Sequence, residues 1–353
     1  MKYKLVLENG KEFIGTNFGS NESKIGEIFF STSMVGYQDI LSDPSYYGKI
    51  VCMSYPLIGN YGLTDEDYDF KNIHIEGYVV KENNDYPSNF RSTRTLSDAM
   101  EENKVVGISD IDTREIIKII RDEGLMKAMI CESSKPLKHC LKELKEYQEN
   151  ENPVKEVSCK KIWYSRTANP LFNVVIIDLG IKTTLVKKLN EYGLNIIIVQ
   201  YNTSIEDIKK LKPNGIIISN GPGNPNNYKD IQKIIKDLIK NKYPILGLGL
   251  GAQIIALYYG ANVLKMKHGH QGANIPVRNI ETDKIDITSQ NHFYEIKIDN
   301  IKGIKATHIN VLDGDIEGFI DEKNKIIGIQ YLIQETLNEK ENIILKFMKN
   351  MKK

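Results

Sequence analysis

The second half of this 353-residue chain is predicted to fold as a doubly wound, mostly parallel α/β sheet, and the first half as a smaller α/β domain. Two observations predict the sheet. Continuous apolar runs, typical of strands buried on both faces, alternate with helical patterns. Glycine and small polar residues follow directly after the expected strands, at the sheet edge where ligands bind in this fold class.

The first domain is expected over residues 1–150. Residues 1–8 alternate like a strand, and Asn9-Gly10 is a strong signal for a hairpin turn. Asp110 and Asp112 precede an amphipathic run. This pair of carboxylates could suggest a metal site, but a helix N-cap is favoured, because a cap oxygen satisfies the free amides of the first turn.

Residues 151–170 are polar and charged, and we expect a linker there. The second domain is expected over residues 171–353. Its pattern predicts buried strands at 174–178, 195–200, 215–219 and 244–248, and helices at 183–192, 230–241 and 253–259.

Composition argues against several classes of partner. The formal net charge is +1, so there is no electrostatic reason to expect nucleic acid or an anionic membrane. No apolar run approaches the ~18 residues of a membrane-spanning helix. The four cysteines fall in no metal-ligand spacing, and we expect a reduced, cytoplasmic protein.

The turn at Gly249 joins an apolar strand directly to an apolar helical run. Many α/β enzymes place a nucleophile at such a turn, yet glycine has no side chain. Residues 247–252 also fit the dinucleotide fingerprint G-x-G-x-x-G/A. We disfavour dinucleotide binding, because this is about the fourth strand of its domain and no carboxylate follows at the distance that ribose recognition needs.

His268 and His270 could share a strand face and bind a metal. No third ligand stands at a recognisable spacing, so a loop is favoured over 268–274. Residues 220–224 are expected to form a turn at the end of a strand, and 289–292 form a polar segment after a strand-like run.

Together these motifs resemble the carbamoyl-phosphate synthase small-subunit family, whose C-terminal half is a class I glutamine amidotransferase. The resemblance covers nearly the whole chain. The segments that carry it are residues 31–46, 55–62, 88–91, 110–114, 178–180, 219–223, 264–270 and 290–292.

Members of this family carry G-I-C-L-G-H-Q at the turn and Q-G-H-P-E near the C-terminus. By this resemblance Gly249 occupies the position of the nucleophilic Cys, Leu332 that of the His and Gln334 that of the Glu. Glutamine hydrolysis by the family mechanism needs all three groups. The resemblance therefore implies a pseudo-enzyme in which no member of the triad is intact.

The resemblance also places glutamine contacts at Ser45, Gly221, Gly223, Leu250, Gln253, Asn291 and Tyr294. Phe293 is bulky where the family has glycine, which puts glutamine binding in doubt. The alternative is that the retained residues only hold the loops together.

The function implied by the resemblance is support of a large subunit that makes carbamoyl phosphate, for arginine or pyrimidine biosynthesis, from free ammonia. ATP and a divalent metal would belong to that partner, and no cofactor is expected in this chain. Two alternatives stay open. One is a non-catalytic module that senses glutamine. The other is an active amidotransferase with a different nucleophile, for which His292 is the nearest base and Ser219 or Ser289 could offer a hydroxyl.

Overall fold

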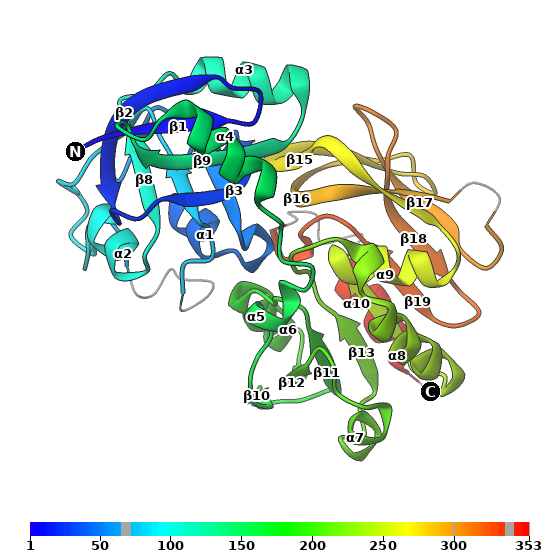
Figure 1. Cartoon of the computed structure of the whole chain (residues 1–353). Coiled ribbons are helices and arrows are strands. Elements are labelled where there is room, and N and C mark those ends of the chain that lie inside the picture. The colour runs from blue at the N-terminus through cyan, green and yellow to red at the C-terminus, as the bar shows by residue number, and fades with distance from the viewer. Residues whose placement is uncertain (65–71, 299–300, 336–341, 353) are drawn as a thin grey trace. The chain divides into compact units, whose positions relative to one another are not determined.

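The computed structural model describes residues 1–64, 72–298, 301–335 and 342–352 (Figure 1). These residues form two compact units, Met1–Asn150 and Glu151–Lys353. None of the helices in the described ranges is long and apolar enough to cross a membrane.

The first unit is built on a closed barrel in the order β1-β2-β8-β6-β4-β3-β9. Strands β1 and β2 form the expected hairpin, and Gly10 in its turn has a φ of 89°. The barrel strands are β1 (Lys2–Leu7), β2 (Glu12–Gly19), β3 (Lys24–Ser31), β4 (Lys49–Met53), β6 (Gly77–Val79), β8 (Val106–Ser109) and β9 (Met126–Glu132).

Helix α3 (Thr113–Glu123) packs on this barrel through Ile116 and Ile120, which lie in the same core cluster as Leu5 of β1. Asp112 Oδ1 accepts the Glu115 N–H at 3.0 Å, so the predicted N-cap is confirmed. The unit also contains α1 (Tyr37–Ser42), η1 (Pro44–Tyr46), the paired β5 (Leu57–Ile58) and β7 (Glu82–Asn83), α2 (Leu96–Glu102) and α4 (Leu137–Glu146).

The second unit contains a ten-stranded sheet in the order β10-β12-β11-β13-β14-β19-β18-β17-β15-β16. Neighbours from β12 to β19 pair in parallel. The strands are β10 (Trp163–Ser165), β11 (Phe172–Asp178), β12 (Leu194–Gln200), β13 (Gly215–Ile218), β14 (Ile245–Leu248), β15 (Asn262–Asn279), β16 (Ile285–Lys297), β17 (Lys305–Asn310), β18 (Ile316–Asp321) and β19 (Ile326–Ile329).

Helices cover both faces of the parallel half, which is therefore doubly wound as predicted (Figure 1). α8 (Lys229–Lys240) and α9 (Leu250–Tyr258) pack with alternate β11 residues such as Val175. α6 (Thr183–Glu191) and α10 (Ile343–Met351) pack with the intervening residues such as Val174. The unit also contains α5 (Val154–Val157), α7 (Ile205–Lys210), η2 (Pro225–Asn227) and η3 (Ile333–Glu335).

Three expectations need correction. Residues 151–170, expected as a linker, contain α5 and β10, because Val154 is buried in the core and β10 pairs with β12. "Mostly parallel" holds for one half of the sheet only, since β16 to β18 join β19 through antiparallel pairs. Residues 268–274, expected as a loop, lie inside β15, whose register shifts on both sides of His270 interrupt the alternating pattern.

Candidate functional site

The candidate site begins at Gly249, where β14 turns directly into α9. Gly249 has φ 49° and ψ −115°, a backbone conformation that residues with a Cβ rarely adopt. Its N–H donates to the Ile329 carbonyl of β19 at 2.8 Å. The sharp strand-to-helix turn predicted from the sequence is therefore present, with a glycine in the strained conformation of a nucleophile elbow.

Ser219, which follows β13, connects the end of β11 to this turn by hydrogen bonds. The Leu179 N–H donates to Ser219 Oγ at 2.9 Å, and the Gly251 N–H donates to the Ser219 carbonyl at 3.1 Å. Asn220 lies against the apex, because a Cβ built on Gly249 would be 3.2 Å from Asn220 Cβ. The structure thus brings together the three strand ends that the sequence places at one edge of the sheet.

Gly251 explains why this turn imitates a dinucleotide fingerprint. A Cβ built on Gly251 would lie 2.2 Å from the Ile218 carbonyl oxygen. The glycine therefore allows α9 to pack closely against β13, and no ligand phosphate is needed to account for it.

The end of β19 lies beside the turn, because β19 is the parallel neighbour of β14. Leu332 and Gln334 follow this strand, the latter within η3. The Leu332 N–H donates to the Ser289 carbonyl at 2.9 Å, which joins this segment to β16. The segment that carries the expected base and carboxylate positions thus begins at the strand end next to Gly249.

The residues expected to contact glutamine fall in both units. Ser45 is in η1 of the first unit, where its N–H donates to Asp43 Oδ1 at 2.9 Å. In the second unit Gln253 Nε2 donates to Gln330 Oε1 at 2.9 Å and to the Tyr294 carbonyl at 3.4 Å. Of the remaining positions, Gly221 and Gly223 follow β13, Leu250 begins α9 and Asn291 lies in β16.

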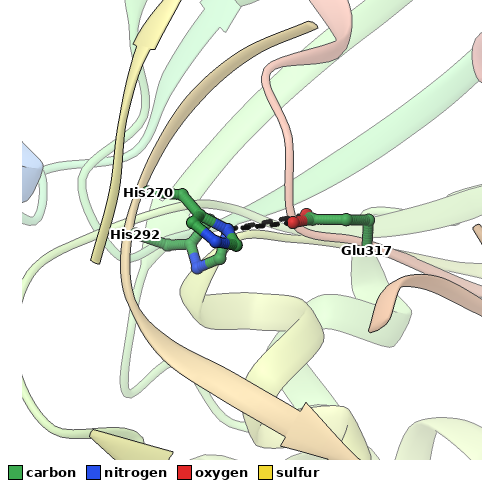
Figure 2. A group of neighbouring side chains, drawn as sticks. All are labelled: His270, His292 and Glu317. Carbon is green, nitrogen blue, oxygen red and sulfur yellow. Dashed lines mark hydrogen bonds and ion pairs between the residues drawn. The ribbon is translucent and has the colours of Figure 1, made fainter. Parts of the chain in front are cut away.

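A buried cluster of His270, His292 and Glu317 was not predicted (Figure 2). Burial opposes the charged form of His270, but Glu317 and Asp313 outweigh it and raise the pKa of His270. Burial likewise opposes ionisation of Glu317, but the two imidazoles outweigh it and lower the pKa of Glu317. The available signal in the sequence was the pair His268 and His270. Only His270 belongs to the cluster, and its partners lie on β16 and β18.

Comparison with known proteins is decisive for the family. Two family descriptions match the chain: "Carbamoyl-phosphate synthase small chain, CPSase domain" over residues 5–130 and "Glutamine amidotransferase class-I" over residues 175–344. The carbamoyl phosphate synthase small chain of Bacillus anthracis is 40% identical over 333 residues, which is 94% of this chain and 90% of that protein. The chain belongs to the carbamoyl phosphate synthase small chain family.

Another relative is the carbamoyl phosphate synthase pyrimidine-specific small chain of Bacillus subtilis (strain 168), also 40% identical, with 94% of this chain and 90% of that protein covered. Among solved structures, a glutamine amidotransferase from Thermotoga maritima is 18% identical with a TM-score of 0.38, and the match covers 46% of this chain and 76% of that one.

Within a carbamoyl phosphate synthase small chain the second unit is the class I glutamine amidotransferase domain. The only cysteine of the second unit is Cys159, which precedes the matched residues 175–344 and whose N–H donates to Asp178 Oδ2 at 2.7 Å. Burial, followed by the charge of Asp178, raises the pKa of the Cys159 thiol to about 12. A thiol with that pKa is almost entirely protonated at neutral pH and is a weak nucleophile.

Two of the groups considered above as substitutes for a triad member, Ser219 and His292, are engaged in structural contacts. Ser219 Oγ accepts from Leu179 and donates to the Asn220 carbonyl at 2.9 Å. His292 Nδ1 faces the Tyr294 carbonyl at 3.0 Å, and its Nε2 faces the buried cluster. Neither side chain belongs to the Gly249 turn.

Proposed function

We propose that this small chain no longer hydrolyses glutamine and instead supports a large subunit that makes carbamoyl phosphate from free ammonia. Gly249 carries the proposal. It stands at the apex of a turn with the backbone conformation of a nucleophile elbow, and it has no atom that can attack a carboxamide.

Two further positions agree with this proposal. Leu332 cannot accept a proton, and Gln334 carries no charge to stabilise an imidazolium. Loss of a whole catalytic triad in a serine protease lowers kcat by about 10⁶, equivalent to ~8 kcal/mol of transition-state stabilisation. Hydrogen-bond donors that remain near the turn cannot offset a loss of that size.

The support role assigns the remaining chemistry to the partner. We propose that the large subunit binds ATP and a divalent metal, and that this chain holds neither as a cofactor. The barrel unit, which corresponds to the synthase-specific part of the family, is the proposed contact surface.

Reconstitution of the chain with its large subunit tests the proposal. We expect carbamoyl phosphate synthesis with ammonium and at least ~10⁵-fold less ammonia released from glutamine than by an intact amidotransferase. The positive control is the triple variant Gly249→Cys, Leu332→His, Gln334→Glu, which should gain weak glutaminase activity. The single variant Gly249→Cys should stay inactive, because its thiol would have no base.

Glutamine-dependent ammonia release by the unaltered complex, abolished by an alkylating glutamine analogue, would contradict the proposal and favour an unrecognised nucleophile. A folded but inactive triple variant would show instead that the surrounding site has also changed.

A second candidate function is glutamine sensing without turnover, and Asn220 is the observation that favours it. Its Nδ2 is buried beside the turn with no hydrogen-bond partner among the described residues. An unsatisfied buried donor costs ~1–3 kcal/mol, which a ligand oxygen would offset. Calorimetry decides between the two functions: sub-millimolar glutamine binding without turnover supports a sensor, and no binding supports a scaffold.

A further inference from the structure

Three strands of the antiparallel half bring two imidazoles and one carboxylate to a single point. His270 comes from β15, His292 from β16 and Glu317 from β18 (Figure 2). His270 Nδ1 lies 3.3 Å from His292 Nε2 and 3.1 Å from Glu317 Oε1. His292 Nε2 lies 3.5 Å from Glu317 Oε2.

These separations match the edges of a metal coordination tetrahedron. With metal–ligand bonds of about 2.0–2.1 Å, neighbouring ligands of a tetrahedral zinc ion stand ~3.3–3.4 Å apart. The His270–His292 separation of 3.3 Å matches this value, and each imidazole has one Glu317 oxygen at a similar distance, Oε1 at 3.1 Å from His270 and Oε2 at 3.5 Å from His292. Gln290 Oε1 lies 3.1 Å from His292 Nε2 and is a further oxygen beside the cluster.

The outer hydrogen bonds orient both imidazoles for this purpose. His270 Nε2 lies 2.6 Å from Asp313 Oδ2, and His292 Nδ1 lies 3.0 Å from the Tyr294 carbonyl. Both of these oxygens accept hydrogen bonds, so each outer nitrogen is placed to carry an N–H. A bound metal ion would take the place of any proton on the inner nitrogens, and His270 Nδ1 and His292 Nε2 would then offer lone pairs beside Glu317. Metal-binding histidines commonly have this carboxylate or carbonyl partner on the far nitrogen.

The buried Glu317 carboxylate needs a positively charged partner, either a proton on a neighbouring imidazole or a bound metal ion. The Glu317 side chain has no exposed surface, and that of His292 is 2% exposed. The Gln290 amide donates to Thr288 Oγ1 at 3.2 Å, which leaves its Oε1 directed at His292. Electron-rich atoms that meet in a dry interior repel one another unless a proton or a metal ion lies among them.

We propose that His270, His292 and Glu317 bind a divalent transition-metal ion, and that zinc fits this nitrogen and oxygen donor set best. The site is buried, and we assign it a structural role. It would join β15, β16 and β18 and would fix the Tyr294 carbonyl, which also accepts from Gln253. The inference does not depend on the proposed loss of glutaminase activity.

A second group, His270 with Asp313 and Asp315, is a weaker candidate. Asp315 Oδ1 is already paired with Lys297 Nζ at 2.8 Å, and Asp313 is hydrogen-bonded to the outer nitrogen of His270. These residues therefore support the first site rather than form another.

Metal analysis of the purified full chain tests the proposal. After removal of metal by a chelator and titration with zinc, we expect one ion per chain and a higher melting temperature. Cobalt(II) in place of zinc should give the strong visible absorption of a tetrahedral site. Glu317→Gln should lower zinc affinity by more than 100-fold, and the outer variant Asp313→Asn by about 10- to 100-fold.

His268→Gln is the matched control, because this exposed histidine lies on the same strand outside the cluster and should leave binding unchanged. If the unaltered chain neither binds one zinc ion nor shows the cobalt bands, the proposal is overturned, regardless of the behaviour of the variants. A proton would then be the cation of the cluster. Loss of zinc binding in His268→Gln would also overturn the proposal, because the metal would then be bound at the protein surface.

Discussion

Cys159 is the residue on which an unrecognised thiol mechanism would depend. Its thiol is half-buried beside Asp178, and both burial and that carboxylate disfavour the thiolate. With a pKa of about 12, the thiolate fraction at pH 7.5 is on the order of 10⁻⁴ to 10⁻⁵, whereas an ordinary cysteine near pKa 8.5 reaches roughly a tenth.

We therefore expect alkylation of Cys159 by iodoacetamide to rise about tenfold per pH unit from pH 7 through pH 10, because the raised pKa keeps the thiol protonated over this whole range. Peptide mass spectrometry measures the rate at this one site. In the urea-unfolded chain the same rate should level off near pH 9. A plateau below pH 9 in the folded chain would show a low thiol pKa and would return Cys159 to consideration as a nucleophile.

At the scale of elements, the turn between β14 and α9 depends on two glycines for different reasons. Gly249 has a positive φ, and a Cβ there would meet only Asn220, whose Cβ at 3.2 Å would have to move by a few tenths of an ångström. Gly251 has no room, because the Ile218 carbonyl oxygen occupies the position of a Cβ.

We expect Gly249→Ala to fold and to lose ~1–3 kcal/mol of unfolding free energy, the typical cost of one strained backbone conformation. Gly251→Ala should lose more than ~4 kcal/mol or fail to fold, since backbone must move. Urea unfolding of the two variants makes the comparison. Equal losses would show that the turn is not held as the structure describes it.

The sequence predicted the parallel strands well because each is a continuous apolar run that ends in small residues. β13 is a clear case, with Ser219 at its end. The antiparallel half was harder to predict. Gly269 and Gly272 interrupt the alternation of β15, and the cluster joins residues 22 and 47 positions apart, a pairing that no local pattern encodes. The positions that we propose as a degenerate triad came from the family resemblance, and periodicity alone would have missed them.

At the scale of the whole molecule, the barrel unit exposes large apolar side chains that its own stability does not explain. Phe90 is 96% exposed and Tyr86 89%. Exposed aromatic side chains are common anchors of protein interfaces, and Phe90 lies in a segment that carries the family resemblance.

We expect Phe90→Ala to weaken association with the large subunit by at least ~10-fold, as loss of an interface anchor does. Its melting temperature should stay close to that of the unaltered chain, because the side chain has few contacts to lose. Leu312→Ala, at a 73% exposed position of the other unit, is the control. Equal effects of the two substitutions on a binding titration would place the interface elsewhere.

The glycine at the Gly249 turn also limits how this chain can evolve. A cysteine there would have to adopt a φ near 49°, which carries a conformational cost from the first substitution. If positions 332 and 334 are those of the base and the carboxylate, as we propose, that cysteine alone would gain no activity while they remain Leu and Gln. Under the proposed loss of glutaminase activity, selection would meet a loss of stability before any gain in chemistry, so no single substitution would restore a working glutaminase.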